Sequence, residues 1–227
     1  MATIELKEEL HANTRRTRIT YRALIDGQEV AIKCYRKPLF GLIHWLRALR
    51  RGKKIRRAGG PVPPVAFSGW FPPMSCFAFG TKFLDGYVSL RDALTREQSL
   101  DRRLEMVRML GLVVGDLHRR GIVQPDGNLT NFLIRRNADI AMVDEDDVQV
   151  YSAPLPRRLA ISNLGNIAAR LPNKEMVKEL LAGYMDKGIV PSSPEWDDGA
   201  FWTSVEEWRV LLHAKRVSRN IAARDFD

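Results

Sequence analysis

Alternating apolar and polar residues in the first third of the chain predict β-strands. The segment RITYRALIDGQEVAIKCYR (18–36) contains two strand-prone runs on either side of Asp26-Gly27, a residue pair suited to tight turns. It therefore predicts a β-hairpin. SCFAFGTKFL (75–84) predicts a further strand, and AGGPVPPV (58–65) is typical of a loop because Gly and Pro break regular structure.

Helical periodicity appears first between residues 39 and 57, where Leu42, Leu46 and Leu49 recur on one side among arginines. After residue 88 it dominates. Helices are predicted over residues 89–94, 99–120, 158–171, 174–187 and 204–222, with short strands at 132–134 and 140–143. Ser89 with Asp92 suits the first turn of the 89–94 helix. Thr203 with Glu206 fits a capping box for the last helix.

These elements predict an α+β protein in two parts. Residues 1–84 form a small β-rich part with one basic helix, and residues 85–227 form a larger, mainly α part. The change in composition near residues 84–88 predicts a hinge between them.

Composition is ordinary for a soluble globular protein, with 45% apolar and 28% charged residues. No uninterrupted apolar run approaches the roughly 20 residues that cross a bilayer. Cys34 and Cys76 are too few for a disulfide framework, and both fall in predicted strands. A reducing, cytoplasmic location is expected. The histidines and cysteines show no zinc-binding pattern.

The net charge of +9 is unevenly distributed along the chain. No acidic residue lies between Glu29 and Asp85. The cations of this interval are Lys33, Arg36, Lys37, Arg47, Arg50, Arg51, Lys53, Lys54, Arg56, Arg57 and Lys82. Such a field favours anionic partners, so the basic helix (39–57) suggests peripheral contact with an anionic membrane or a phosphorylated lipid. A solvated helix that packs its apolar side on the small part is an equal alternative.

Three separated segments carry residues suited to phosphoryl transfer. VAIK ends at Lys33, the loop of IVQPDGNLTNFLI (122–134) contains Asp126 and Asn131, and IAMVDEDD (140–147) brings Asp144 after an apolar strand. Phosphoryl transfer needs a cation for nucleotide phosphates, oxygen ligands for Mg²⁺ and a carboxylate that orients the attacking hydroxyl. Each residue also has a plainer explanation: Lys33 as a solvated strand residue, Asp126 as a turn former, Asn131 as a loop cap and Asp144 as a strand-end acid.

In order and spacing, these segments resemble the protein-kinase-like superfamily, and in particular the bacterial lipopolysaccharide kinases of the Kdo/WaaP group. LHRRGIVQPDGNLTN (117–131) is similar to the catalytic segment LHxxGIxxxDxNxxN, and DED (144–146) is similar to the group's DFD variant. AGGPVPPV is similar to the group's AGIPVPxP element. The similarity covers roughly residues 20 to 185.

The resemblance implies a bilobal protein-kinase-like fold and an ATP- and Mg²⁺-dependent kinase acting on a hydroxyl, a sugar of the lipopolysaccharide core in this group. Lys33 would hold the nucleotide phosphates, and Phe83, Leu84 and Asp85 would line the adenine. Asn131 and Asp144 would bind Mg²⁺, and Asp126 would be the catalytic carboxylate. The expected location is the cytoplasm, peripherally on the inner membrane of a Gram-negative bacterium.

The sequence also departs from the superfamily's pattern. No glycine lies between His11 and Leu24, where a Gly-rich loop normally covers the phosphates, and HANTRRTR (11–18) suggests phosphate contact through arginines instead. The basic helix contains no Glu that could pair with Lys33. Gln124-Pro125 stands before Asp126 where His-Arg or His-Gly is usual. These departures keep a second hypothesis open, a pseudokinase scaffold of the same fold.

A nucleic-acid-binding protein is the third hypothesis. It explains the cationic interval but leaves Asp126, Asn131 and Asp144 without a role, so nucleic acid is not the expected partner. His118 is interpreted as a packing residue that ties a helix to the loop rather than as a proton carrier.

Overall fold

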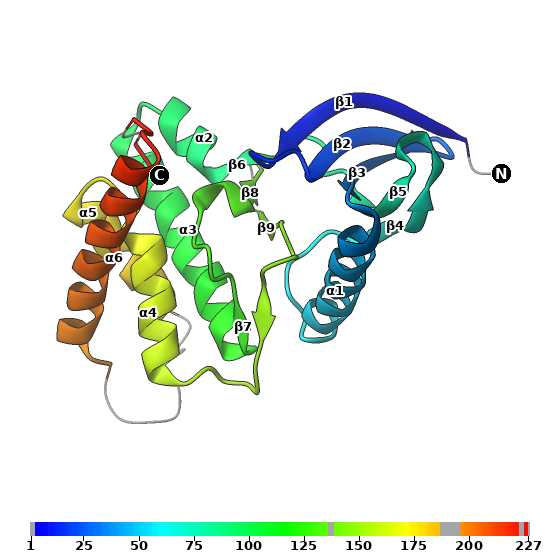
Figure 1. Cartoon of the computed structure of the whole chain (residues 1–227). Helices are drawn as coiled ribbons and strands as arrows, with labels where there is room; N and C mark the ends of the chain where they lie inside the picture. The colour runs from blue at the N-terminus through cyan, green and yellow to red at the C-terminus, as the bar shows by residue number, and fades with distance from the viewer. Residues whose placement is uncertain (1–2, 136–138, 187–195, 223–224, 227) are drawn as a thin grey trace. The chain divides into compact units, whose positions relative to one another are not determined.

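The computed structural model describes residues 3–135, 139–186, 196–222 and 225–226, and is mixed α+β with 46% helix and 25% strand (Figure 1). The chain divides into two compact units. Unit 1 comprises Met1–Arg56 and Val62–Asp85, and unit 2 comprises Arg57–Pro61 and Gly86–Asp227. The main division falls within one residue of the predicted boundary at 84/85. That the two units are the lobes of a kinase-like fold stays a prediction.

Unit 1 is built on a five-stranded antiparallel sheet of order β1-β2-β3-β5-β4. Its strands are β1 (Ile4–Ala12), β2 (Arg18–Ile25), β3 (Gln28–Tyr35), β4 (Val65–Phe71) and β5 (Cys76–Lys82). The predicted hairpin is confirmed as β2 and β3. Its turn residues Asp26 and Gly27 both have positive φ, 49° and 79°, as a two-residue turn that follows the sheet twist requires. The predicted strand at 75–84 is confirmed as β5.

Strands β1 and β4, the two edges of the sheet, had no sequence prediction. Strand β1 is IELKEELHA, mostly exposed, with register shifts against β2 between Leu6 and Glu8 and between Glu9 and His11. Strand β4 follows a Pro-rich segment and has its own register shift. An edge strand with little burial lacks the regular apolar alternation that marks a central strand.

Helix α1 (Pro38–Arg57) packs on one face of this sheet (Figure 1). Trp45, Ala48 and Leu49 contact Tyr35 and Phe79 there, whereas the opposite face holds the core around Val30, Ile32 and Cys34. The helix is confirmed, but its predicted leucine face is not its most buried one. The most buried positions are Gly41, Ala48, Gly52 and Ile55. Small residues bring the helix close to the sheet, and a Cβ at Gly41 would lie 2.5 Å from the Tyr35 carbonyl oxygen.

Unit 2 is mainly helical. Its helices are α2 (Leu90–Arg96), α3 (Leu100–Arg119), α4 (Arg157–Ala168), α5 (Lys174–Met185) and α6 (Asp198–Ser218). Its strands are β6 (Val88–Ser89), β7 (Ile122–Val123), β8 (Phe132–Ile134), β9 (Ile140–Met142) and β10 (Gln149–Val150). They pair as β6-β8-β9 and β10-β7. Helices α3 and α5 are in close contact, since a Cβ at Gly183 would lie 2.0 Å from the Arg108 carbonyl oxygen.

Helix starts agree with the sequence except in α6. Ser89 accepts a hydrogen bond from the Asp92 amide at 3.1 Å, and Ser99 accepts one from the Arg102 amide at 3.4 Å. The predicted capping box at Thr203 and Glu206 is wrong. Helix α6 begins six residues earlier than predicted, because Asp197 caps it by accepting from the Ala200 amide at 2.9 Å. The predicted end of α5 at Lys187 lies outside the described residues. Among the helices of the described residues, none has the length and apolarity to span a bilayer.

Candidate functional site

The loop between β7 and β8 contains Asp126 and Asn131. It turns at Gly127, whose φ is +61°, and ends in a 3-10 turn, Leu129–Asn131, capped by the Asn128 side chain, which accepts from the Thr130 amide at 3.0 Å. Asn131 is buried, whereas 48% of the Asp126 side chain is exposed. The loop therefore presents one carboxylate to solvent and one amide to the interior.

Three consecutive carbonyl oxygens of this loop accept hydrogen bonds from side chains on or just after α4. Asn163 Nδ2 donates to Gln124 O at 2.9 Å, and Asn166 Nδ2 donates to Pro125 O at 2.8 Å. Arg170 Nη2 donates to Asp126 O at 2.6 Å. Since the donors are spaced three and four residues apart, one side of the helix follows the loop residue by residue. The backbone at Asp126 is thus fixed from outside the loop.

His118 of α3 forms hydrogen bonds with Asn163 of α4 and with Tyr184 of α5. It lies 3.1 Å by Nδ1 from the Tyr184 hydroxyl and 2.9 Å by Nε2 from Asn163 Oδ1. Because the Asn163 amide nitrogen donates to Gln124, its oxygen accepts, so the His118 proton is assigned to Nε2 and Tyr184 donates to Nδ1. Complete burial lowers the pKa of His118 to about 4 from its usual 6.5, against a smaller opposing effect of Asn163. His118 is therefore neutral, which agrees with its interpretation as a packing residue.

Just beyond the paired strands β8 and β9, the backbone of Asn131 bonds that of Val143, the residue before Asp144. The Val143 amide donates to Asn131 O at 2.8 Å, and Gln124 Nε2 donates to Val143 O at 3.4 Å. The residue before Asp144 is thus bonded at both its amide and its carbonyl to the segment that contains Asp126. Asp144 itself has φ +62°, a left-handed conformation that is uncommon outside glycine and found most often in Asn and Asp.

The acidic residues that follow β9 differ in how far they are buried. Glu145 is buried, Asp146 is half-buried and Asp147 is exposed. No three His, Cys, Asp or Glu side chains of the described residues gather so that they alone could hold a metal ion. Carboxylate and amide oxygens, as in Asp144 and Asn131, are hard ligands that suit Mg²⁺, which usually takes only one or two protein carboxylates and completes its shell with phosphates and water. The donor set therefore fits Mg²⁺ that arrives with a nucleotide.

The predicted nucleotide residues belong to unit 1. Lys33 lies in the middle of β3, opposite Thr20 on β2 and Phe79 on β5, and is half-buried. Because strand side chains alternate, it projects on the α1 side of the sheet, away from the core of Ile32 and Cys34. That Lys33 completes one site with the residues of unit 2 stays a prediction.

Phe83, Leu84 and Asp85 close unit 1. The Phe83 amide donates to Glu29 O at 3.0 Å, and the Arg22 guanidinium lies 4.4 Å from the centre of the Phe83 ring. Leu84 is half-buried and Asp85 is exposed. Their contact with adenine likewise stays a prediction.

Unit 1 shows what stands in place of two features of the kinase pattern, the Gly-rich loop and the Glu that pairs with the strand lysine. The turn between β1 and β2 is closed by Asn13, whose Oδ1 accepts from the Arg18 amide at 3.0 Å, and Arg16 forms a two-point ion pair with Glu9 at 2.7 and 3.0 Å. That pair uses one arginine predicted to meet phosphate. Glu29, the acid nearest Lys33 on β3, bonds Arg22 at 2.7 and 2.8 Å, and this lowers the pKa of Glu29.

No protein-family model matches the chain, and none of the curated proteins matches it.

Asn163, Asn166 and Arg170 were not predicted as site residues. The available signal was their polar character at spacings of three and four within LAISNLGNIAARL (159–171), whose other residues are apolar except for Ser162. Polar residues on the buried side of a helix require hydrogen-bond partners, but the sequence does not say which segment supplies them.

Proposed function

We propose that this protein is an ATP- and Mg²⁺-dependent kinase of the protein-kinase-like type that transfers a phosphoryl group to a hydroxyl. The acceptor in this proposal is a sugar of the lipopolysaccharide core, on the strength of the sequence resemblance. A cytoplasmic location, where ATP is available, is part of the same proposal.

The observation that carries the proposal is the pair of hydrogen bonds at Val143. They tie the residue before Asp144 to Asn131 and to the segment of Asp126, so the three proposed functional residues of unit 2 share one rigid backbone frame. In phosphoryl transfer the protein contributes mainly positioning and charge. The backbone frame supplies the positioning, and the carboxylates of Asp126 and Asp144 supply charge. The left-handed φ of Asp144 adds support, because strained backbone is concentrated at functional sites.

The proposed roles follow from the chemistry of each side chain. The exposed Asp126 carboxylate accepts the proton of the acceptor hydroxyl, while Arg170 and Gly127 fix its backbone. The oxygens of Asn131 and Asp144 hold Mg²⁺, which, when bound, neutralises charge on the phosphates. The Lys33 ammonium pairs with nucleotide phosphates.

The test is ADP release from ATP and Mg²⁺ in the presence of lipopolysaccharide core acceptors. Asp126→Asn should lower turnover by about a hundredfold or more while nucleotide still binds. Asp144→Asn should lower turnover and also abolish the Mg²⁺ dependence of nucleotide affinity. Asp147→Asn, which removes the same charge at an exposed position three residues further on, should leave turnover within about twofold of wild type. Equal turnover in all three variants and wild type rejects the proposal.

A pseudokinase of the same fold is the second candidate, favoured by the absence of any carboxylate in α1 and by the commitment of Glu29 to Arg22. Thermal stabilisation by ATP and Mg²⁺ without ADP release from any acceptor supports this candidate. Detectable Asp126-dependent transfer eliminates it.

A further inference from the structure

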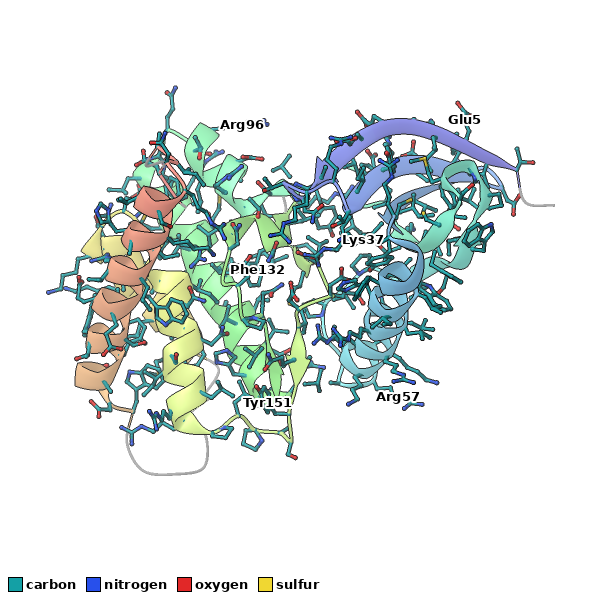
Figure 2. The ribbon with its side chains drawn as sticks, viewed as in Figure 1. Glu5, Lys37, Arg57, Arg96, Phe132 and Tyr151 are labelled. Carbon is teal, nitrogen blue, oxygen red and sulfur yellow. The ribbon has the colours of Figure 1, made fainter. Side chains whose placement is uncertain are left out.

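One side of α1 carries a continuous row of exposed residues. Its members, named here the α1 outer stripe, are Phe40, Ile43, Arg47, Arg50, Lys54 and Arg57. They recur every three or four residues, which is the spacing of one helix face, and Gly41, Ala48, Gly52 and Ile55 occupy the buried side. Figure 2 labels Lys37, just before the helix, and Arg57, its last residue.

The stripe is cationic over most of its length. None of Arg47, Arg50, Lys54 and Arg57 forms an ion pair with any described residue of the chain. No carboxylate lies between Glu29 and Asp85 in the sequence, so α1 itself offers no compensating charge. These four charges are available to an external anion.

The first turn of the stripe is apolar. Phe40 is 63% exposed and Ile43 is 46% exposed. The Lys37 ammonium lies 6.0 Å from the centre of the Phe40 ring, so an apolar group and a cation also meet at this end. Large apolar side chains exposed beside a row of cations are typical of a helix that lies in a membrane interface.

We propose that the α1 outer stripe docks this protein on the surface of an anionic lipid bilayer. Phe40 and Ile43 enter the boundary between headgroups and acyl chains, and the cations that follow meet the phosphate groups. Nucleic acid would satisfy the cations but offers no apolar medium to the first turn. The inference is independent of phosphoryl transfer, because the stripe contains none of the residues proposed for that reaction.

The test is sedimentation of the full chain with vesicles of equal parts phosphatidylcholine and phosphatidylglycerol, and with vesicles of phosphatidylcholine alone. Binding is expected only to the anionic vesicles and should weaken steeply as salt is added. The variant R47Q/R50Q/K54Q should bind about a hundredfold more weakly, at about fivefold for each cation removed. Its control is R96Q/K178Q/K215Q, which removes three exposed cations from α2, α5 and α6 and should change binding by less than twofold.

A second pair of variants tests the apolar turn at constant charge. F40S/I43S should weaken binding about tenfold. V210S/V217S, which alters residues of α6 that are 68% and 66% exposed, should leave binding unchanged. All four variants change exposed positions, and an unchanged thermal midpoint verifies that each is folded.

Three results overturn the inference: no sedimentation with anionic vesicles at low salt, equal loss in a stripe variant and its control, or unaltered vesicle binding by F40S/I43S. The stripe would be a nucleic-acid surface instead if F40S/I43S binds vesicles as wild type does, the wild type binds duplex DNA, and R47Q/R50Q/K54Q does not.

Discussion

Arg170 contacts Asp126 mainly through the backbone: its Nη2 lies 2.6 Å from the Asp126 carbonyl oxygen but 3.8 Å from the carboxylate. The Arg170 side chain is only 6% exposed, and its Nη1 also donates to Asn166 O at 2.7 Å and to Asn166 Oδ1 at 2.6 Å. Burial of a charged group is costly unless hydrogen bonds compensate for the lost water, so these bonds keep the Arg170 guanidinium stable in the interior. The contact therefore holds the loop in place and leaves the carboxylate available.

Arg170→Met should lower the free energy of unfolding by about 3 kcal/mol, because three acceptors lose their donor. Asp126→Asn should cost less than about 1 kcal/mol, since the carboxylate is half exposed and distant. Arg158→Met, the same chemical change at an exposed position of α4, serves as control and should fall within about 0.5 kcal/mol of wild type. Urea denaturation measures all three. A larger effect of Asp126→Asn than of Arg170→Met contradicts the backbone role.

Gly127→Ala should destabilise the protein more than Gly27→Ala, although both glycines have positive φ, +61° and +79°. Each Ala costs about 1 kcal/mol of backbone strain. A Cβ at Gly127 would in addition lie 2.9 Å from the Asn166 side chain, whereas nothing lies within 4 Å at Gly27. Displacing Asn166 breaks its bond to Pro125 O, so Gly127→Ala should lose about 2 to 3 kcal/mol in total. Equal thermal midpoints for the two variants would refute the predicted clash.

Asp144→Asn should be more stable than Asp144→Ala by about 1 kcal/mol. Both substitutions remove the charge, but Asn tolerates the left-handed conformation at φ +62° better than Ala does. Chemical denaturation of the two purified variants measures the difference. An Ala variant as stable as the Asn variant would mean that the backbone relaxes at this position.

Stability should fall as pH is lowered from 7.5 to 5, partly because of His118. Burial lowers its pKa to about 4 in the folded state, whereas the exposed side chain of the unfolded protein keeps the ordinary pKa of 6.5 and binds the proton first. The stability that the neutral ring contributes is complete above the unfolded pKa and declines as pH falls toward 4. At pH 5 the loss is about 2 kcal/mol. Urea midpoints across this range should show a steeper pH dependence in wild type than in His118→Gln, and parallel curves would exclude the assignment.

Gly183→Ala should lower the free energy of unfolding by more than about 3 kcal/mol. Its Cβ would lie 2.0 Å from a backbone oxygen of α3, which cannot move without separating α3 from α5. Gly199→Ala, near the exposed start of α6, is the control. There the nearest atom is the Asp197 side-chain oxygen at 3.3 Å, and the result should lie between no change and a gain of about 1 kcal/mol. Calorimetry of the two variants distinguishes them.

The sequence alone was sufficient to predict those features of the fold that are determined by residues close together in the chain. The turn at Asp26-Gly27 and the cap at Ser89 are of this kind, since the side chain or φ angle that ends the element belongs to the element itself. The start of α6 shows the limit. Thr203 and Glu206 matched a capping pattern, but Asp197 provides the actual cap further upstream.

Contacts between residues far apart in the chain could not be predicted from the sequence pattern. Asn163 and Asn166 reach loop residues 39 and 41 positions away, and Arg170 reaches one 44 positions away. No local pattern encodes such a pairing. The pairing that brings Asn131 to Val143, the residue before Asp144, could be anticipated, because two short apolar strands follow each other closely and pair as β8 and β9. The functional roles of these residues, and of Lys33 in unit 1, stay predictions.

The row of side-chain donors along α4 also has a dynamic consequence. Each loop residue from Gln124 to Asp126 is held by a different donor, so the segment cannot open one residue at a time without stranding polar groups in the interior. The loop and the helix should exchange their amide hydrogens with solvent as a single cooperative unit, at a rate set by the separation of α4 from the rest of unit 2.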